Sequence, residues 1–252
     1  METLNIRGIP LEVHMAGSGP PLLFLHAEQF ILQARPFLDA LARTHRVIAP
    51  RHPGFGTAQL PPDFRTVDDI AYLYLDLAEK LGLENAVLAG ASLGGWIALE
   101  MCVRNHARFA KLALVSPVGV KLSGREERDF ADIFYLPDPE AMAAAFADPA
   151  RFAPSYEALP VADVEQLARE KQALAYYAWR PYLHKPGLER WLHRVALPTL
   201  VVCGEQDRFA APEYGRKLAE RLPDARVTMI AGAGHYPQIE RADAVAKAIS
   251  AF

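Results

Sequence analysis

Residues 86–96 read Ala-Val-Leu-Ala-Gly-Ala-Ser-Leu-Gly-Gly-Trp and contain a GxSxG pattern. The apolar run before Gly90 predicts a buried strand, and the residues after Gly94 predict a helix. A turn this tight strains the serine backbone, so the two glycines avoid Cβ clashes while the Ser92 hydroxyl projects from the edge of a sheet. The stretch therefore predicts a strand, a turn and a helix that carry a candidate nucleophile, with the backbone N–H of Leu93 placed to stabilise negative charge.

Short apolar runs alternate with helical patterns on both sides of this stretch. They are apolar throughout, which is typical of parallel strands that helices cover on both faces. Residues 2–15 alternate instead, and they predict an antiparallel hairpin at one edge. The predicted fold class is α/β, with a mostly parallel central sheet flanked by helices. The predicted buried strands are 22–25, 47–49, 86–89, 112–115, 199–203 and 227–230.

Four helices are predicted between or after these strands. The clearest begins after Thr66, a candidate N-cap with Asp69 three residues on, and ends near Gly82. Its apolar residues recur at intervals of three and four, as one buried helix face requires. The other predicted helices cover about 95–104, 212–221 and 242 to the C-terminus.

Residues 121–195 break the alternation, because they contain helical or irregular patterns and no convincing strand. This segment carries 11 of the 24 aromatic residues in less than a third of the chain. We expect a helical lid inserted between two strands of a core formed by residues 1–120 and 196–252. The aromatic residues could line a pocket under the lid or pack it onto the core, and the sequence leaves both alternatives open.

The composition excludes several classes of protein. The 252 residues are 51% hydrophobic and 23% charged, which predicts one globular domain with an insertion. A net charge of −3 argues against nucleic acid or an anionic membrane as a partner, so we expect a small-molecule substrate. The N-terminus lacks the features of a signal peptide, and no run approaches the roughly 18 apolar residues of a membrane span. A cytoplasmic protein is therefore expected.

Cysteine and metal chemistry are not indicated. Cys102 and Cys203 each lie inside an apolar segment, which favours buried thiols over a disulfide or a nucleophile. The chain has no HExxH or CxxC motif and no closely spaced histidine pair, so neither a metal site nor a cofactor is predicted.

A serine nucleophile needs a base, and the base needs a third group to orient it. His235 follows the last predicted strand in a glycine-containing loop that can return the imidazole over the sheet. Asp207 follows the strand that ends near Cys203, with Glu205 as its local competitor. The loop after the strand 112–115 contains no carboxylate, which favours Asp207 by elimination.

The other histidines fit structural roles better. His26 ends a strand, and a histidine there is more often a structural hydrogen-bonding residue. The remaining six are expected to be solvated or capping residues: His14, His45, His52, His106, His184 and His193.

With these residues in the order serine, aspartate, histidine, the chain resembles the α/β-hydrolase fold family over almost its whole length. Further similar stretches are 22–26, 49–56 and 234–240. They look like the branch that contains lid-bearing esterases and carbon–carbon hydrolases. The resemblance implies Ser92 as nucleophile, His235 as general base and Asp207 as the residue that orients it.

The loop after the first parallel strand departs from the family. The family usually has His-Gly there, whereas this chain has His26-Ala27. The resemblance implies the backbone N–H of Glu28 as the second oxyanion-hole donor beside that of Leu93. A carboxylate is unexpected there, so we expect the Glu28 side chain to point away or to pair, for example with Arg180. A second hypothesis is that Glu28 selects substrates with a donor or a positive group near the scissile bond.

The sequence predicts a serine hydrolase that cleaves a small, largely apolar carboxylic ester through an acyl-enzyme. Two alternatives stay open: hydrolysis of a carbon–carbon bond in a diketone-like substrate, and a non-catalytic protein that binds a small molecule on the same fold. The candidate substrate contacts are Ala27, Tyr236 and four aromatic residues of the insertion, Phe130, Phe134, Tyr176 and Trp179.

Overall fold

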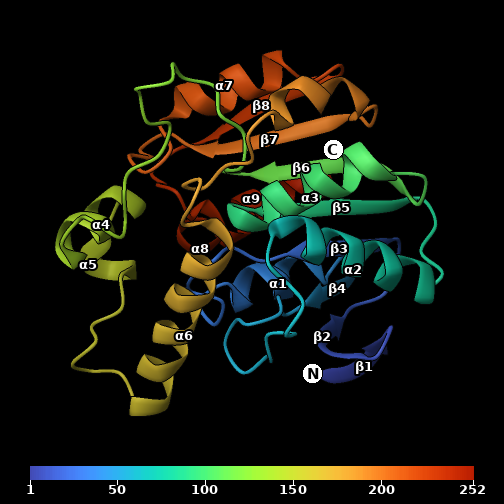
Figure 1. Ribbon diagram of the computed structural model, residues 1–252, viewed down its shortest axis with the longest axis horizontal. Helices are drawn as coiled ribbons and strands as arrows, with labels where there is room; N and C mark the ends of the chain where they lie inside the picture. The colour runs from blue at the N-terminus through green and yellow to red at the C-terminus, as the bar shows by residue number, and fades with distance from the viewer.

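A computed structural model describes residues 1–252. Its centre is an eight-stranded sheet in the order β1-β2-β4-β3-β5-β6-β7-β8 (Figure 1). The order of β3 and β4 is exchanged relative to the sequence, as a crossover requires. The strands are β1 Glu2–Ile6, β2 Ile9–Ala16, β3 Pro21–Leu25, β4 Arg46–Pro50, β5 Ala86–Ala91, β6 Phe109–Val115, β7 Thr199–Gly204 and β8 Ala225–Ile230.

The strand pairing confirms the mostly parallel sheet. β1 pairs with β2 as an antiparallel hairpin, and β2 continues antiparallel onto β4. All pairs from β4 to β8 are parallel. Parallel strands end at the same edge, so the loops after β3, β5, β7 and β8 come together there.

Helices cover both faces of the sheet. The pair α2 and α3 packs on one face, and the pair α1 and α9 packs on the other, where α9 also contacts β7 and β8 (Figure 1). Their bounds are α1 Arg35–Leu41, α2 Val67–Lys80, α3 Leu93–Arg104, α7 Pro212–Glu220, α8 Pro237–Glu240 and α9 Ala242–Ser250. The four predicted helices are confirmed, whereas α1 and α8 were not predicted.

The first residues of α2 and α3 show how each helix begins. Thr66 caps α2 in a capping box with Asp69, as the sequence predicts. α3 begins at Leu93 rather than near residue 95, so the predicted start was wrong. Gly94 and Gly95 lie inside the first turn because the helix packs closely there: a Cβ on Gly94 would lie 2.1 Å from the carbonyl oxygen of Leu25. Close packing, not helix termination, explains these glycines.

The segment between β6 and β7 is helical. It contains α4 Asp138–Ala145, α5 Pro149–Phe152, α6 Val161–Ala178 and the 3-10 helix η1 Leu188–Arg194. Its only β-type pairing is an isolated bridge between Gly119 and His184. α4, α5 and α6 lie to one side of the sheet (Figure 1). No helix of the protein combines the length and the apolar character needed to cross a membrane.

Candidate functional site

Ser92 occupies a strained turn between β5 and α3. Its φ of 46° lies in the left-handed region, which costs energy for any residue except glycine. Its N–H donates to the carbonyl oxygen of Val115 at 2.9 Å, and its own carbonyl oxygen accepts from the first turn of α3. A Cβ on Gly90 would lie 2.2 Å from the carbonyl oxygen of Gly94, so the turn can close only with glycine at position 90. The local geometry that the GxSxG pattern predicts is present.

Three buried side chains form one hydrogen-bonded chain at this turn. Ser92 Oγ lies 2.9 Å from His235 Nε2, and His235 Nδ1 lies 2.8 Å from Asp207 Oδ2. Because an ionised carboxylate only accepts, His235 carries a proton on Nδ1 and its Nε2 can accept the serine proton.

Asp207 is held in place by its second oxygen. Asp207 Oδ1 accepts the backbone N–H groups of Phe209 and Ala210 at 2.9 and 2.8 Å. Its competitor Glu205 is exposed and makes no hydrogen bond to His235. The structure therefore brings Asp207, and not Glu205, to the imidazole.

The charge around His235 sets its proton affinity. Burial alone would lower the pKa of His235, but the charge of Asp207, its hydrogen bond and the charge of Glu28 together raise that pKa above its ordinary value of 6.5. The nearby carboxylates thus favour the protonated imidazole, which is the form that a base reaches after it has accepted a proton.

Glu28 makes its contacts inside the site. Its side chain is 1% exposed and points into the site. Glu28 Oε2 accepts the backbone N–H of Leu93 at 3.3 Å, and Oε1 accepts the hydroxyl of Tyr236 at 2.6 Å. The side chain therefore pairs rather than points away, but its partners are an amide and a phenol, and the suggested partner Arg180 is exposed.

The loop that carries Glu28 is turned inward by a residue of the insertion. Phe30 has a φ of 61°, and its N–H donates to Glu170 Oε2 on α6 at 3.0 Å. Burial raises the pKa of Glu170 to about 7, although its hydrogen bonds from Gln166 and Phe30 oppose the shift. Sequence reasoning missed Glu170, because a lone glutamate on a helix far along the chain carries no signal of burial.

A pair of stacked histidines supports the start of the same loop. The rings of His26 and His52 lie 3.6 Å apart, and His26 Nε2 accepts the backbone N–H of His52. Burial lowers the pKa of His26 to about 3, so this histidine is neutral. The structural role expected for His26 fits these contacts, whereas the expectation that His52 is solvated or a cap was wrong: it is fully buried and hydrogen-bonds Tyr74.

The loop of His235 is joined to the insertion. The backbone N–H of His235 donates to the carbonyl oxygen of Ala145 at 2.7 Å. The buried carboxylate of Glu240 accepts the N–H of Gly234 at 2.6 Å and those of Ala147 and Asp148 at 3.0 and 3.1 Å. In the sequence, Glu240 is only the last residue of the stretch 234–240 that resembles the family. Its three amide contacts show that it ties the end of α4 to the histidine loop.

Comparison with known proteins identifies the family. Residues 22–248 match the model of the alpha/beta hydrolase family, which is most of the chain. The chain belongs to the alpha/beta hydrolase family. This assignment agrees with the sheet order and with the turn that holds Ser92.

Individual hydrolases resemble it over nearly the whole length. The chain is 28% identical to a 2-hydroxymuconate semialdehyde hydrolase of Pseudomonas sp. (strain CF600), covering 97% of this chain and 90% of the relative. It is 26% identical to a pimeloyl-(acyl-carrier protein) methyl ester esterase of Nitrosospira multiformis, covering 93% and 95%. The fold is also similar to the crystal structure of a bacterial membrane phospholipase A, with a TM-score of 0.81, 23% identity and coverage of 99% and 84%.

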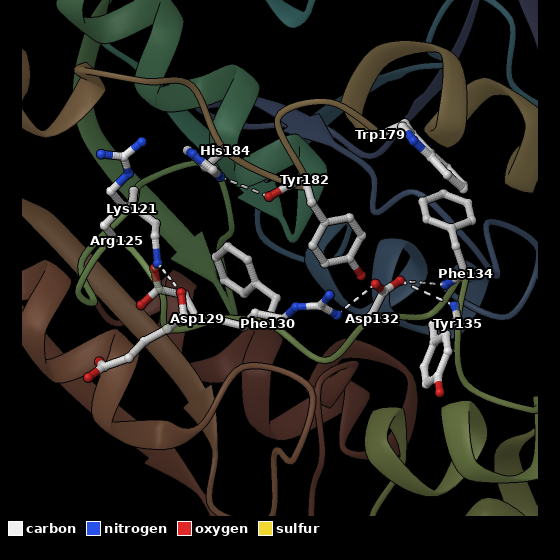
Figure 2. A pocket seen from close by; sticks show the side chains of 12 residues that line it. Lys121, Arg125, Asp129, Phe130, Asp132, Phe134, Tyr135, Trp179, Tyr182 and His184 are labelled. Carbon is white, nitrogen blue, oxygen red and sulfur yellow. Dashed lines mark hydrogen bonds and ion pairs between the residues drawn. The ribbon is translucent and has the colours of Figure 1, made fainter.

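The hydrolase has a cavity of about 450 Å³ in the inserted segment. Figure 2 shows the rings of Phe130, Tyr182, Phe134 and Trp179 along it, with charged side chains between them. Ser92 and His235 do not line this cavity. Two ring contacts connect the cavity to the site. The ring centroids of Phe130 and Phe209 lie 6.2 Å apart, and those of Phe209 and His235 lie 4.3 Å apart.

The other candidate substrate contacts divide into two groups. Ala27 and Tyr236 are buried beside the site, and the ring of Tyr236 packs against His235 at 5.1 Å. Tyr176 lies elsewhere: its hydroxyl donates to the carbonyl oxygen of Phe64 and accepts from Arg65, and it is 41% exposed. The structure does not bring Tyr176 to Ser92, because the face of α6 that carries it packs against the 64–65 loop.

Proposed function

We propose that this hydrolase cleaves a small, largely apolar carboxylic ester through an acyl-enzyme. In this proposal Ser92 is the nucleophile, His235 the general base and Asp207 the residue that orients the imidazole. The observation that carries the proposal is the buried hydrogen-bonded chain from Ser92 Oγ to His235 and on to Asp207, with distances of 2.9 and 2.8 Å.

The reaction follows from these contacts. Ser92 Oγ attacks the ester carbonyl carbon and passes its proton to His235 Nε2, while the backbone N–H groups of Leu93 and Glu28 donate to the resulting oxyanion. In the resting protein the Leu93 N–H donates to Glu28 Oε2, so the oxyanion replaces that acceptor. The imidazolium then gives the proton to the leaving alkoxide, and the acyl-enzyme forms. Water repeats the attack, with His235 again as base, and releases the acid.

We propose that residues 121–195 act as a lid over this site. The cavity beside Phe130, Phe134 and Trp179 offers an apolar wall for the acyl or alcohol part of a substrate. The contact from Phe130 through Phe209 to His235 supports a path from this cavity to the nucleophile.

A second candidate reaction is hydrolysis of a carbon–carbon bond in a diketone-like substrate. The similarity to the 2-hydroxymuconate semialdehyde hydrolase favours it. The same three residues would serve, with a carbanion equivalent as the leaving group in place of an alkoxide.

The experiment is hydrolysis of p-nitrophenyl esters of graded acyl length, with a diketone as a parallel substrate. Ser92→Ala and His235→Ala should each lower kcat by at least about a thousandfold, with the melting temperature kept as a folding control. Ester turnover that survives Ser92→Ala would refute the mechanism. Turnover of the diketone alone would select the second reaction, and stoichiometric fluorophosphonate labelling without turnover of either would select a binding protein.

A further inference from the structure

The N–H of Leu93 already has a partner inside the protein. In an acyl transfer at Ser92, the carbonyl oxygen of the substrate must accept a hydrogen bond from the amide that follows the nucleophile. That amide is Leu93 N–H, and Glu28 Oε2 accepts it at 3.3 Å. A substrate oxygen and the Glu28 carboxylate therefore require the same hydrogen.

Charge makes the two occupants incompatible. The substrate oxygen becomes negative as the tetrahedral intermediate forms, and Glu28 is buried with a carboxylate oxygen at that amide. Two like charges in a site this dry repel strongly, because little water screens them. The intermediate can form at the Leu93 amide only after the carboxylate has moved.

The two hydrogen bonds of Glu28 are unequal. The bond from the Tyr236 hydroxyl is 2.6 Å long, which is typical of a strong bond to an ionised acceptor, whereas the bond from Leu93 is 3.3 Å long. Tyr236 is 2% exposed, and its ring packs against Phe30, Phe146 and His235. The rigid phenol is thus the tether, and the contact at Leu93 is the one that yields first.

We propose that Glu28 occupies the oxyanion hole of the resting hydrolase as an internal competitor of the substrate, held there by Tyr236. This inference rests on the proposed function of Ser92. The Glu28 side chain swings away from the Leu93 amide when a substrate carbonyl enters, and ligands that place an oxyanion there bear the cost of moving it.

The test compares a ligand that forms an oxyanion with one that does not. A trifluoromethyl ketone adds reversibly to serine: the Ser92 Oγ–carbon bond forms, the carbonyl π bond breaks, and the serine proton goes to His235, which leaves an oxyanion at the Leu93 amide. The corresponding secondary alcohol has the same shape and forms no adduct. Inhibition constants of both ligands are measured for the wild type, Glu28→Ala and Tyr236→Phe.

Removing the Glu28 carboxylate or the Tyr236 hydroxyl should strengthen binding of the ketone but not of the alcohol. If the hole is open about one-tenth of the time in the wild type, the apparent affinity for the ketone is reduced about tenfold, and Glu28→Ala should recover that factor. Tyr236→Phe keeps the ring that packs on His235 and should recover part of it. The alcohol should bind all three proteins equally.

The contrary result is equally clear. Unchanged or weaker ketone binding in both variants, with alcohol binding intact, would overturn the inference and would assign Glu28 a supporting role in catalysis. If Glu28→Ala fails to fold, Tyr236→Phe alone decides. Ser92→Ala, combined with the wild type and with each variant, distinguishes failure of the proposed function from failure of this inference. Residual ester turnover without Ser92 refutes the proposed function, whereas complete loss leaves only the role of Glu28 in question.

Discussion

The loops after β7 and β3 each bring one buried carboxylate to the same site, with opposite consequences. Asp207 accepts two backbone amides and faces His235, a group that becomes positive when it accepts a proton. Glu28 accepts a phenol and an amide and faces the place where negative charge develops. In the proposed reaction, Asp207 is complementary to the positive charge that develops on His235, whereas Glu28 opposes the negative charge that develops at the Leu93 amide.

The difference lies in what anchors each carboxylate. The anchors of Asp207 belong to its own loop, so its position depends on residues two and three places along the chain. The anchor of Glu28 is Tyr236, more than two hundred residues away. A carboxylate fixed locally is suited to permanent orientation, and one fixed by a distant side chain is suited to displacement.

Asp207→Asn removes the carboxylate that faces His235 and should have the largest effect. The remaining oxygen can still accept the amides of Phe209 and Ala210, but the new NH₂ group faces His235 Nδ1 and forces the wrong tautomer. We expect kcat for ester hydrolysis to fall about ten-thousandfold. Glu205→Gln, in the same loop but exposed, is the matched control and should retain full activity. An equal loss in both variants would contradict the assignment.

Glu170→Gln, at the residue that holds the Glu28 loop, should raise the folding stability of the protein at alkaline pH. The folded pKa of Glu170, about 7, lies above its ordinary value of 4.5, so the folded state binds more protons than the unfolded state between these values. Wild-type stability should therefore fall as pH rises through this window, and the variant should be more stable at pH 8 by on the order of 2 kcal/mol, with no difference below about pH 4.5.

Urea unfolding at several pH values measures this difference. The exposed Glu165 lies on the same helix, and Glu165→Gln provides the control without a pH-dependent gain. A constant difference between Glu170→Gln and the wild type across the pH range would show that Glu170 is not buried as a titrating group.

Glu28→Gln should move the acid limb of the pH profile. His235 must be neutral to accept the serine proton, so activity is lost as pH falls through its pKa. Burial lowers that pKa, while the charges of Asp207 and Glu28, the two ionisable groups that act on the imidazole, raise it. Removing one charge should shift the acid limb of kcat/KM to lower pH. An unmoved limb would mean that the charge of Glu28 does not act on His235 in the free enzyme, whose ionisation the kcat/KM profile reports.

The smallest expected effect concerns the charge of the substrate. An ester with an ammonium group near the scissile bond should be favoured over its neutral isostere by a factor of about two to five in the wild type, since the cost of removing water from the ammonium group offsets most of its attraction to the buried Glu28 carboxylate. Glu28→Gln should abolish the preference. Equal kcat/KM values for both esters in both proteins would end the hypothesis that Glu28 selects cationic substrates.

Much of the frame could be predicted from local pattern. The buried strands are short apolar runs, and Gly90 of the Ser92 turn is required by its backbone contact with Gly94, a near neighbour in the sequence. Loops that follow parallel strands meet at one edge, which is why the sequence alone allows Ser92, Asp207 and His235 to be grouped. Each of these inferences depends on residues within one element and the loop that follows it.

The remaining features depend on distant contacts. The direction of Glu28 is set by Tyr236 and by the loop that Glu170 holds inward, and neither partner is near in sequence. His52 is buried because His26 stacks on it. Tyr176 was a candidate for the site only because the sequence does not reveal which face of α6 meets the core. Such features follow from packing between elements, which a single sequence does not encode in a readable pattern.

The carboxylate of Glu240 makes the insertion less modular than its place in the chain implies. It joins Gly234 to Ala147 and Asp148, and a Cβ on Gly234 would lie 2.5 Å from the carbonyl oxygen of Ala145. The end of α4 and the histidine loop therefore fit each other as one unit. A chimaera that exchanged residues 121–195 for those of a relative would have to retain 143–148, or it would lose the position of His235.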